Sequence, residues 1–169
     1  MSVAVEFDAV NIVFGDNPAA ALPLMDQDQS REEIQSATGQ ILGVHNCSLT
    51  VETGEILVLM GLSGSGKSTL LRAVNGLNPV ARGNVLVNNG TEMTDITKAD
   101  KASLRDIRLN RVAMVFQQFG LLPWRTVRDN VGLGLELAGQ SPAQRNDRVE
   151  KQLALVGLSD WADRKVGEL

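Results

Sequence analysis

The sequence contains, at residues 61–69, the run Gly61-Leu62-Ser63-Gly64-Ser65-Gly66-Lys67-Ser68-Thr69, which fits the pattern G-x-x-x-x-G-K-[ST]. Residues 55–60, which come just before it, form an apolar run suited to a buried strand, and residues 70–74 are typical of a helix. A strand, a glycine-rich turn and a helix in this order form the context in which the pattern marks a phosphate-binding loop. The motif therefore predicts a nucleotide site in an α/β fold, whereas the alternative is a Gly/Ser-rich turn before an ordinary helix.

Each residue type in the loop has a chemical reason to be there. Glycines let the backbone curl so that successive N–H groups point inward at a helix N-terminus, where they can bind an anion. We expect Lys67 to reach the β- and γ-phosphates, Ser68 to place its hydroxyl on Mg²⁺, and Thr69 to reach an earlier phosphate. The residues expected to hold the nucleotide are Gly61, Ser63, Gly64, Ser65, Gly66, Lys67, Ser68 and Thr69. The implied cofactors are ATP and Mg²⁺.

Composition excludes several other classes of protein. The chain has 169 residues, 43% of them hydrophobic, which is enough for one domain or most of one. Its formal net charge is −4 and it has no long basic run, which argues against nucleic acid as a partner. No apolar stretch approaches the ~20 residues that a membrane-spanning helix needs, and the N-terminus is unlike a signal peptide. Cys47 is expected to be a small core residue, and His45 to be structural or facing solvent.

Hydrophobic alternation predicts the strands. Residues 3–7 and 10–14 read as two half-buried strands that pair with each other. Residues 47–51 and 56–60 flank a turn and predict another hairpin, and the continuous apolar run at 112–116 suits the centre of a sheet. A further strand is expected at residues 84–87, before the turn Asn88-Asn89-Gly90.

Capping residues predict the helices. Ser30 with Glu33 forms a capping-box pattern, so a short helix is expected from Arg31 to Thr38, ended by Gly39. Thr97 and Ser141 are expected to cap two further helices. These two helices are expected at residues 98–108 and 142–156. Others are expected at residues 67–75 and 126–138, with a last short one after Asp160.

A second motif makes the nucleotide hypothesis specific. Residues 115–127, Val-Phe-Gln-Gln-Phe-Gly-Leu-Leu-Pro-Trp-Arg-Thr-Val, resemble the Q-loop segment of ABC-transporter ATP-binding subunits. Together with residues 61–69 this segment marks that superfamily, and the resemblance runs over nearly the whole chain. The insertion between Phe14 and Gly39 resembles the glycine betaine/proline and choline uptake branch. Residues 122–127 and 161–169 look closest to its choline-type subunits.

The resemblance implies an α/β fold, the ABC-type nucleotide-binding domain of the P-loop NTPases. Residues 1–60 would be a mostly β part with an insertion at 15–40, residues 61–117 would run from the phosphate loop to the Q-loop through a RecA-like core, and residues 118–169 would begin the helical subdomain. The domain would be incomplete at the C-terminus. Leu169 would open the signature motif, and the Walker B aspartate, the catalytic glutamate and the switch histidine would lie beyond it. We therefore expect the 169 residues alone to hydrolyse ATP negligibly.

The resemblance also assigns residues outside the loop. Phe14 would stack on adenine, although it could instead continue the core of Val10 and Ile12. Gln117 would touch Mg²⁺ and the attacking water, and with Lys67 it forms the expected catalytic pair; the alternative for Gln117 is a polar residue at a strand end.

Between residues 119 and 124 lies an unusually apolar loop, with Phe119, Leu121, Leu122 and Trp124. In the family this region lies beside the groove that receives a helix of the permease, and apolar side chains suit such a contact. Packing against the chain's own helical subdomain is the other interpretation.

The function that the resemblance implies is energy coupling in a bacterial importer. The chain would belong to the ATP-binding subunit of an ABC importer for choline or related quaternary amines such as glycine betaine and proline betaine. Its partners would be a second copy in a head-to-tail dimer, transmembrane permeases at the cytoplasmic face of the inner membrane and, indirectly, an extracytoplasmic solute-binding protein. The alternatives are a non-transport ABC-type module or a truncated product. A kinase or GTPase is disfavoured because no acceptor-binding lid and no Asn-Lys-x-Asp element is found.

Overall fold

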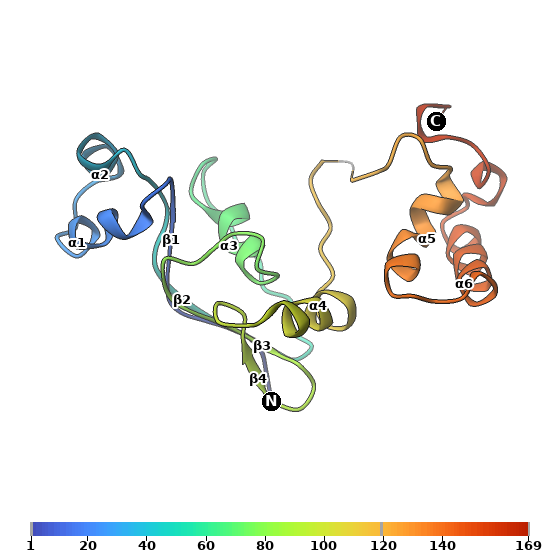
Figure 1. Ribbon diagram of the computed structural model, residues 1–169, viewed down its shortest axis with the longest axis horizontal. Helices are drawn as coiled ribbons and strands as arrows, with labels where there is room; N and C mark the ends of the chain where they lie inside the picture. The colour runs from blue at the N-terminus through green and yellow to red at the C-terminus, as the bar shows by residue number, and fades with distance from the viewer. Residues whose placement is uncertain (1, 119, 169) are drawn as a thin grey trace. The chain divides into compact units, whose positions relative to one another are not determined.

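The computed structural model describes residues 2–118 and 120–168. It divides into two compact units, Met1–Val112 and Ala113–Leu169, which are described separately below (Figure 1). The expectations for Phe119 in the apolar loop and for Leu169 at the start of the signature motif lie outside the described residues.

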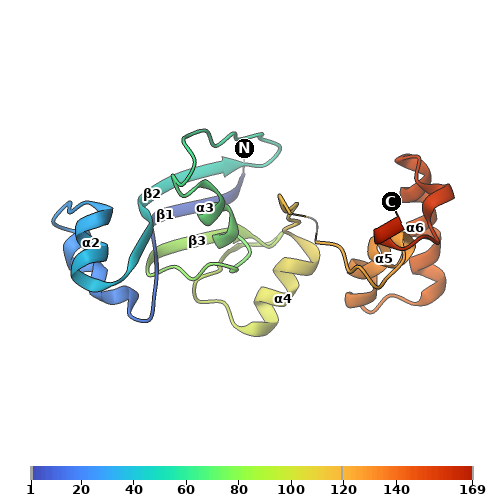
Figure 2. The same ribbon diagram turned by 90° about the horizontal axis from the view of Figure 1, so that it is seen from above.

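The first unit is built on a four-stranded antiparallel sheet with the strand order β2-β1-β3-β4. Figure 2 labels its first three strands. The strands are β1 (Val3–Phe14), β2 (Ile41–Glu52), β3 (Arg82–Asn88) and β4 (Met93–Asp95). Strand β1 pairs with β2 along one edge and with β3 along the other, so both of its edges are hydrogen-bonded. The short strand β4 was not expected from the sequence.

The expected hairpin of residues 3–7 with 10–14 is wrong, because these residues form one continuous strand. The register against β2 shifts between Phe7 and Val10, and Ala9 has a positive φ of 47°. A bulge of this kind adds one residue to a strand and resets which side chains face the core. It mimics a strand break in the sequence pattern, but Phe7, Val10 and Ile12 all remain buried on the same sheet.

Two other expected strands do not form among the described residues. Residues 56–60 and 112–116 have no strand assignment, and 47–51 pair with β1 rather than with 56–60. Their side chains are largely exposed, with Ile56 at 90% and Val115 at 97%. A strand exists only through hydrogen bonds to a neighbouring strand. No described strand lies alongside either run, so their apolar composition alone does not make them strands.

The core of the first unit lies between the sheet and two helices. Helix α3 (Lys67–Ala73) buries Leu70 and Ala73, and helix α4 (Lys101–Asn110) buries Ile107. These side chains join one cluster with the inward-facing residues of the sheet, which are Phe7, Val10, Ile12, Val44, Val85 and Val87, together with Ile96.

Helix α4 begins later than expected. Its N-cap is Asp100, whose carboxylate accepts a hydrogen bond from the Ser103 N–H, whereas Thr97 donates its own N–H and hydroxyl to Asp95. Both side chains could cap a helix. The local turn after β4 uses Thr97, which leaves the capping position to Asp100.

Residues between β1 and β2 form a small folded lobe. It consists of a 3₁₀ turn (Pro18–Ala21), helix α1 (Leu22–Met25) and helix α2 (Arg31–Thr38). The Ser30–Glu33 capping box and the left-handed Gly39 at the end of α2 are confirmed. The lobe has its own apolar cluster, which contains Val13, Ala21, Met25, Ile34 and Leu42.

The second unit is a helical hairpin. Helices α5 (Val127–Leu137) and α6 (Pro142–Leu155) pack through Val127, Val149, Leu153 and Ala162, and two 3₁₀ turns follow (Ser159–Trp161 and Val166–Glu168). Ser141 caps α6 with Pro142 at its first position, as expected. Among the described residues, no helix is both long enough and apolar enough to cross a bilayer.

Candidate nucleotide site

The glycine-rich loop closes around the ammonium group of Lys67. The Lys67 Nζ donates to the carbonyl oxygens of Gly61 at 2.8 Å and Leu62 at 2.7 Å, and lies 3.1 Å from the Ser65 hydroxyl. Lys67 is itself the first residue of α3, so the charge lies where the loop enters the helix. The loop is therefore already curled, with its cation inside the curl.

Two glycines allow the loop to rest directly on strand β2. Gly66 has a φ of 93°, and a Cβ atom there would lie only 2.5 Å from the carbonyl oxygen of Gly43. A Cβ on Gly43 would in turn meet the Phe14 ring at 2.8 Å and Thr69 Cγ2 at 3.2 Å. No side chain fits at either position. The loop, β2 and the end of β1 thus approach as closely as bare backbone allows.

Burial and hydrogen bonds fix helix α3 beneath the loop. Leu70 and Ala73 are in the core, and the Leu70 N–H donates to the Gly66 carbonyl at 2.8 Å. The Asn78 side chain donates to the Thr69 carbonyl at 2.9 Å. Ser68 is exposed in the first turn and Thr69 is half-buried. The structure therefore brings all the predicted loop residues together, and a phosphate chain fits this donor set: backbone amides, one cation and two hydroxyls.

Phe14 lies at the edge of the same site. It is the last residue of β1, is 36% exposed and pairs with Ile41, which is also exposed. Val10 and Ile12, by contrast, are fully buried. Its position against Gly43 puts an accessible aromatic ring next to α3, which fits the role of an adenine platform; that role stays a prediction.

Gln117 belongs to the second unit and is exposed. Its predicted meeting with Lys67 and Ser68 at a Mg²⁺ ion stays a prediction, since the loop belongs to the first unit. Within the described ranges, no cluster of three or more His, Cys, Asp or Glu side chains could hold a metal. Ser68 and Gln117 remain the predicted magnesium ligands.

Sequence reasoning missed Arg31. Its guanidinium donates to the carbonyl of Gly64 in the loop at 2.9 Å and to the carbonyl of Gly43 in β2 at 3.4 Å. Arg31 is 33 residues away from Gly64 and was expected only as the start of a helix. No local signal links the two positions, because the contact exists only once the lobe has folded against the sheet.

Several titratable groups in the first unit have shifted pKa values. An ion pair with Arg82 holds the pKa of Asp26 below its usual value, and it ties the lobe to β3. Hydrogen bonds from Ser30 lower the pKa of Glu33 at the start of α2. Burial raises the pKa of the half-buried Cys47 thiol, which fits the expectation of an unreactive core residue, and His45 is exposed as expected.

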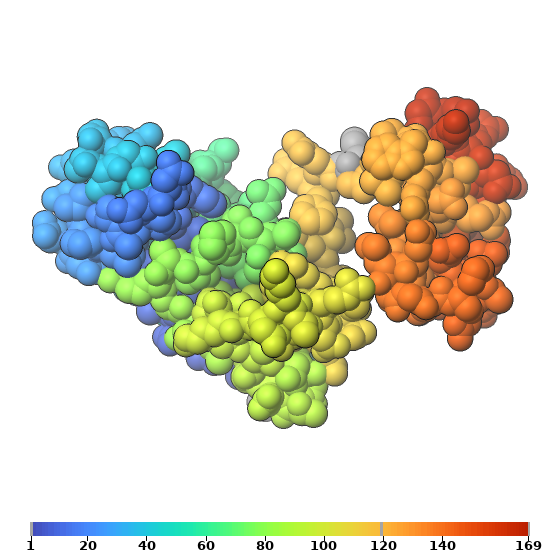
Figure 3. Space-filling model, viewed as in Figure 1, coloured from blue at the N-terminus to red at the C-terminus, as the bar shows by residue number. Residues whose placement is uncertain are grey.

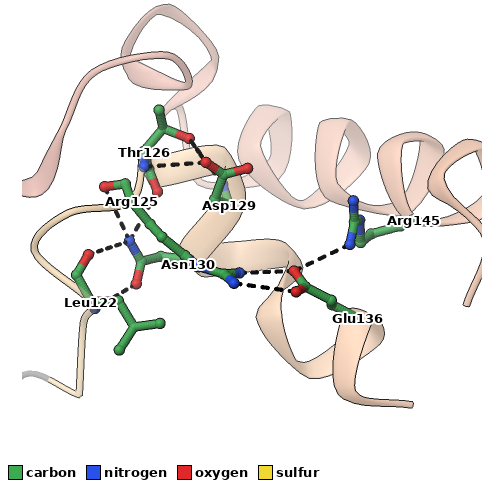
Figure 4. Close-up of polar contacts among 7 residues, drawn as sticks. All are labelled: Leu122, Arg125, Thr126, Asp129, Asn130, Glu136 and Arg145. Atoms are coloured by element: carbon green, nitrogen blue, oxygen red, sulfur yellow. Dashed lines mark hydrogen bonds and ion pairs between the residues drawn. The ribbon is translucent and has the colours of Figure 1, made fainter. Parts of the chain in front are cut away.

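In the second unit, Asn130 organises the apolar loop. Its side chain accepts from the Leu122 N–H at 2.7 Å and donates to the carbonyls of Leu122 and Thr126 (Figure 4). Arg125 and Arg145 both pair with Glu136, so the loop end and both helices are tied together. Trp124 is nevertheless 70% exposed, so an apolar side chain is open to solvent two residues after the position that Asn130 holds.

Comparison with known proteins identifies the family. The sequence pattern described as "ABC transporter" matches residues 44–169, which include the phosphate loop and the Q-loop segment. The chain belongs to the ABC transporter family. The match confirms the resemblance that the two motifs indicated.

Relatives of this ABC-family chain include transport ATP-binding proteins. The glycine betaine/proline betaine transport system ATP-binding protein ProV of Escherichia coli strain K12 is 42% identical over 169 residues, covering 100% of this chain and 41% of ProV. The trimethylamine N-oxide transport system ATP-binding protein TmoW of Ruegeria pomeroyi is 43% identical over 151 residues, covering 89% of this chain and 43% of TmoW. The chain thus spans about two fifths of the length of these relatives.

A solved structure confirms the fold class. The ATP-binding cassette MJ0796, in a dimeric post-hydrolysis state bound to ADP and Pi, is similar with a TM-score of 0.74 and 27% identity. The likeness covers 98% of this chain and 62% of that one. The α/β P-loop fold of an ABC-type nucleotide-binding domain is therefore confirmed, although the two central runs at 56–60 and 112–116 do not form strands here.

Proposed function

We propose that this chain belongs to the ATP-binding, energy-coupling subunit of an ABC importer for choline or a related quaternary amine. The observation that supports this most strongly is the loop closed around Lys67 at the start of α3, resting on Gly43. Such a curled loop with a central cation suits the β- and γ-phosphates of a nucleotide. Membership of the family makes ATP, with Mg²⁺, the expected ligand.

The proposed roles follow the residues at the site. The loop amides and Lys67 hold the phosphates, Ser68 and Gln117 contact Mg²⁺, and Phe14 supports adenine. In a complete site Gln117 orients the attacking water, because its amide can accept from water and contact a metal without adding charge. ATP binding would draw two copies together head to tail, and hydrolysis would release them.

The part of the apolar loop at residues 120–124 is the proposed permease contact. Asn130 fixes the backbone at Leu122, while Trp124 projects to solvent. A preorganised loop with an exposed tryptophan is suited to fill a pocket on a partner. The exposed tryptophan supports contact with a permease over packing on the chain's own helices. The subunit would then act at the cytoplasmic face of a bacterial inner membrane.

The solute class rests on the named relatives. ProV and TmoW are named for betaines and trimethylamine N-oxide, small solutes built on a substituted amine nitrogen. Choline is the finer proposal within that group. An extracytoplasmic binding protein would select the solute, because the ATP-binding subunit would not contact it.

Titration of the chain with a fluorescent ATP analogue in the presence of Mg²⁺ tests the central proposal. Lys67→Ala removes the cation inside the loop and is expected to weaken binding by about tenfold or more. Lys101→Ala, at an exposed position of α4, is the matched control and should bind as the parent chain does. Equal binding by Lys67→Ala and the parent would contradict the proposed site.

Copurification with a membrane permease separates the transport function from a non-transport ABC-type module. The subunit should be retained by its permease, and Trp124→Ala should reduce the retained amount. Trp161→Ala is the control, because Trp161 is 37% exposed, compared with 70% for Trp124, and its ring stacks with Arg164. No retention of the parent subunit would favour the non-transport alternative, whereas retention that is equally insensitive to both changes would contradict the contact through Trp124.

A further inference from the structure

Arg31 joins the inserted lobe to the phosphate loop. Its two guanidinium nitrogens reach carbonyls in different segments, Gly64 in the loop at 2.9 Å and Gly43 in β2 at 3.4 Å. The planar fork of arginine is suited to bridge two acceptors in this way. In the space-filling view the lobe forms a compact mass, coloured blue to cyan (Figure 3).

The position of Arg31 is itself well fixed. It is the first residue of α2, and the Ser30–Glu33 capping box defines where that helix begins. Ile34, one turn further on the same side of the helix, is fully buried in the lobe's apolar cluster. The Asp26–Arg82 ion pair ties the lobe to β3. The guanidinium therefore extends from a packed support.

Both carbonyls that Arg31 contacts belong to residues that shape or support the phosphate loop. Gly43 is the backbone on which Gly66, the last loop residue before α3, rests directly. Gly64 lies two residues earlier, where a Cβ would meet nothing within 4 Å. The loop is thus supported on its inner side by β2, and at Gly64 Arg31 links it to the same strand. A segment with few packing contacts opens locally at low cost unless such a bond restrains it.

We propose that Arg31 is a positioning residue that holds the phosphate loop in its curled, phosphate-accepting form. The inserted lobe then has a function at the nucleotide site, namely to restrain the loop from outside. The consequence for ATP rests on the proposed nucleotide binding, whereas the restraint itself does not. Because the loop is already shaped, less conformational entropy is lost when phosphates bind.

Hydrogen exchange of the nucleotide-free chain tests the restraint. Arg31→Ala is expected to speed exchange of the amides in residues 61–66 by about three- to tenfold, the loss of one exposed charge-assisted contact. Exchange in residues 32–38 should stay the same, which shows that the lobe is still folded. Unchanged exchange in the loop would overturn the proposal, whether or not the chain binds ATP.

Arg82→Ala, in β3, is the matched control that loosens the same lobe. It removes an arginine of equal charge and the ion pair with Asp26, but it leaves Arg31 in place. Loop exchange should remain at the parent rate. If Arg82→Ala speeds loop exchange as much as Arg31→Ala does, loosening of the lobe explains the effect and the specific role of Arg31 is overturned.

Nucleotide titration tests the consequence. Arg31→Ala should weaken the binding of ATP about three- to tenfold. The affinity for adenosine should stay unchanged, since only the phosphates would contact the loop. Arg31→Lys can still donate to the Gly64 carbonyl and should recover part of the loss. Equal loss for ATP and adenosine, or no recovery with lysine, would contradict positioning of the loop. Failure of the parent chain to bind ATP would instead contradict the proposed function. The hydrogen-exchange result would still show whether Arg31 restrains the loop.

Discussion

Residues 3–14 and residues 56–60 are both rich in branched apolar side chains, yet only the first stretch forms a strand. Strand β1 has a hydrogen-bonded neighbour on each edge, and Val10 and Ile12 are fully buried. The run at 56–60 has no partner strand among the described residues, and Ile56 is 90% exposed. Residues 112–116 likewise have no strand assignment, and Val115 is 97% exposed.

An apolar pattern therefore indicates only that a strand is favourable. The strand forms where a neighbouring strand is available to pair with its backbone. Backbone N–H and C=O groups must be paired when they leave water. Strand β1 meets this condition through β2 and β3, which come from distant parts of the chain. The run at 56–60 leads directly into the phosphate loop, so its state also bears on the site.

Replacing one isoleucine by alanine in each stretch should give the largest difference between them. Ile12→Ala empties a fully buried position and is expected to lower the free energy of unfolding by about 2–5 kcal/mol. Ile56→Ala removes an exposed side chain and should change it by no more than about 0.5 kcal/mol. Urea denaturation followed by circular dichroism measures both. Similar losses would mean that residues 56–60 are packed in solution.

Hydrogen exchange should sharpen the contrast at the backbone. The amides of β1 are held by two neighbouring strands, and we expect them to exchange about a hundredfold or more slowly than those of residues 56–60. Mass spectrometry of peptides from each region gives the two rates. Protection of residues 56–60 comparable to that of β1 would show that they have found a partner strand.

The exposed apolar side chains of Val58 and Val115 should also promote self-association. Val58→Lys together with Val115→Lys places charge on both runs and is expected to reduce light scattering at concentrations where the parent chain associates. Leu155→Lys, at an exposed apolar position of α6, is the control and should have a smaller effect. If the control is as effective, net charge rather than these two runs governs association.

The smallest expected effect concerns the tie between the lobe and the paired sheet. The folded-state pKa of Asp26 lies below its usual value because of Arg82, so the stability it contributes is present at neutral pH. That contribution is lost as the pH falls below about 4 and through the lowered pKa. Asp26→Asn should therefore lower the melting temperature slightly at pH 7 and make it less dependent on pH below 5. An unaltered dependence of the melting temperature on pH would show that the ion pair does not contribute to stability.

Local features were predictable because neighbouring residues determine them. The loop at 61–69, the Ser30–Glu33 box and the Ser141 cap each depend on a few consecutive side chains, and all three form as expected. Thr97 shows the limit of such reasoning, since two suitable caps lie three residues apart and the turn after β4 decides between them. The roles of Phe14 and Gln117 came from family resemblance and stay predictions.

The sequence alone was enough to predict the phosphate loop and the starts of α2 and α6, since backbone sterics and capping act over one turn of chain. Only the tertiary structure decided the merging of residues 3–14 into one bulged strand and the unpaired state of residues 56–60. It alone also placed Arg31 on Gly64 and Asn130 on Leu122. The physical reason is that a strand, or a polar side chain, is completed by a partner, and that partner's position depends on how the rest of the chain packs.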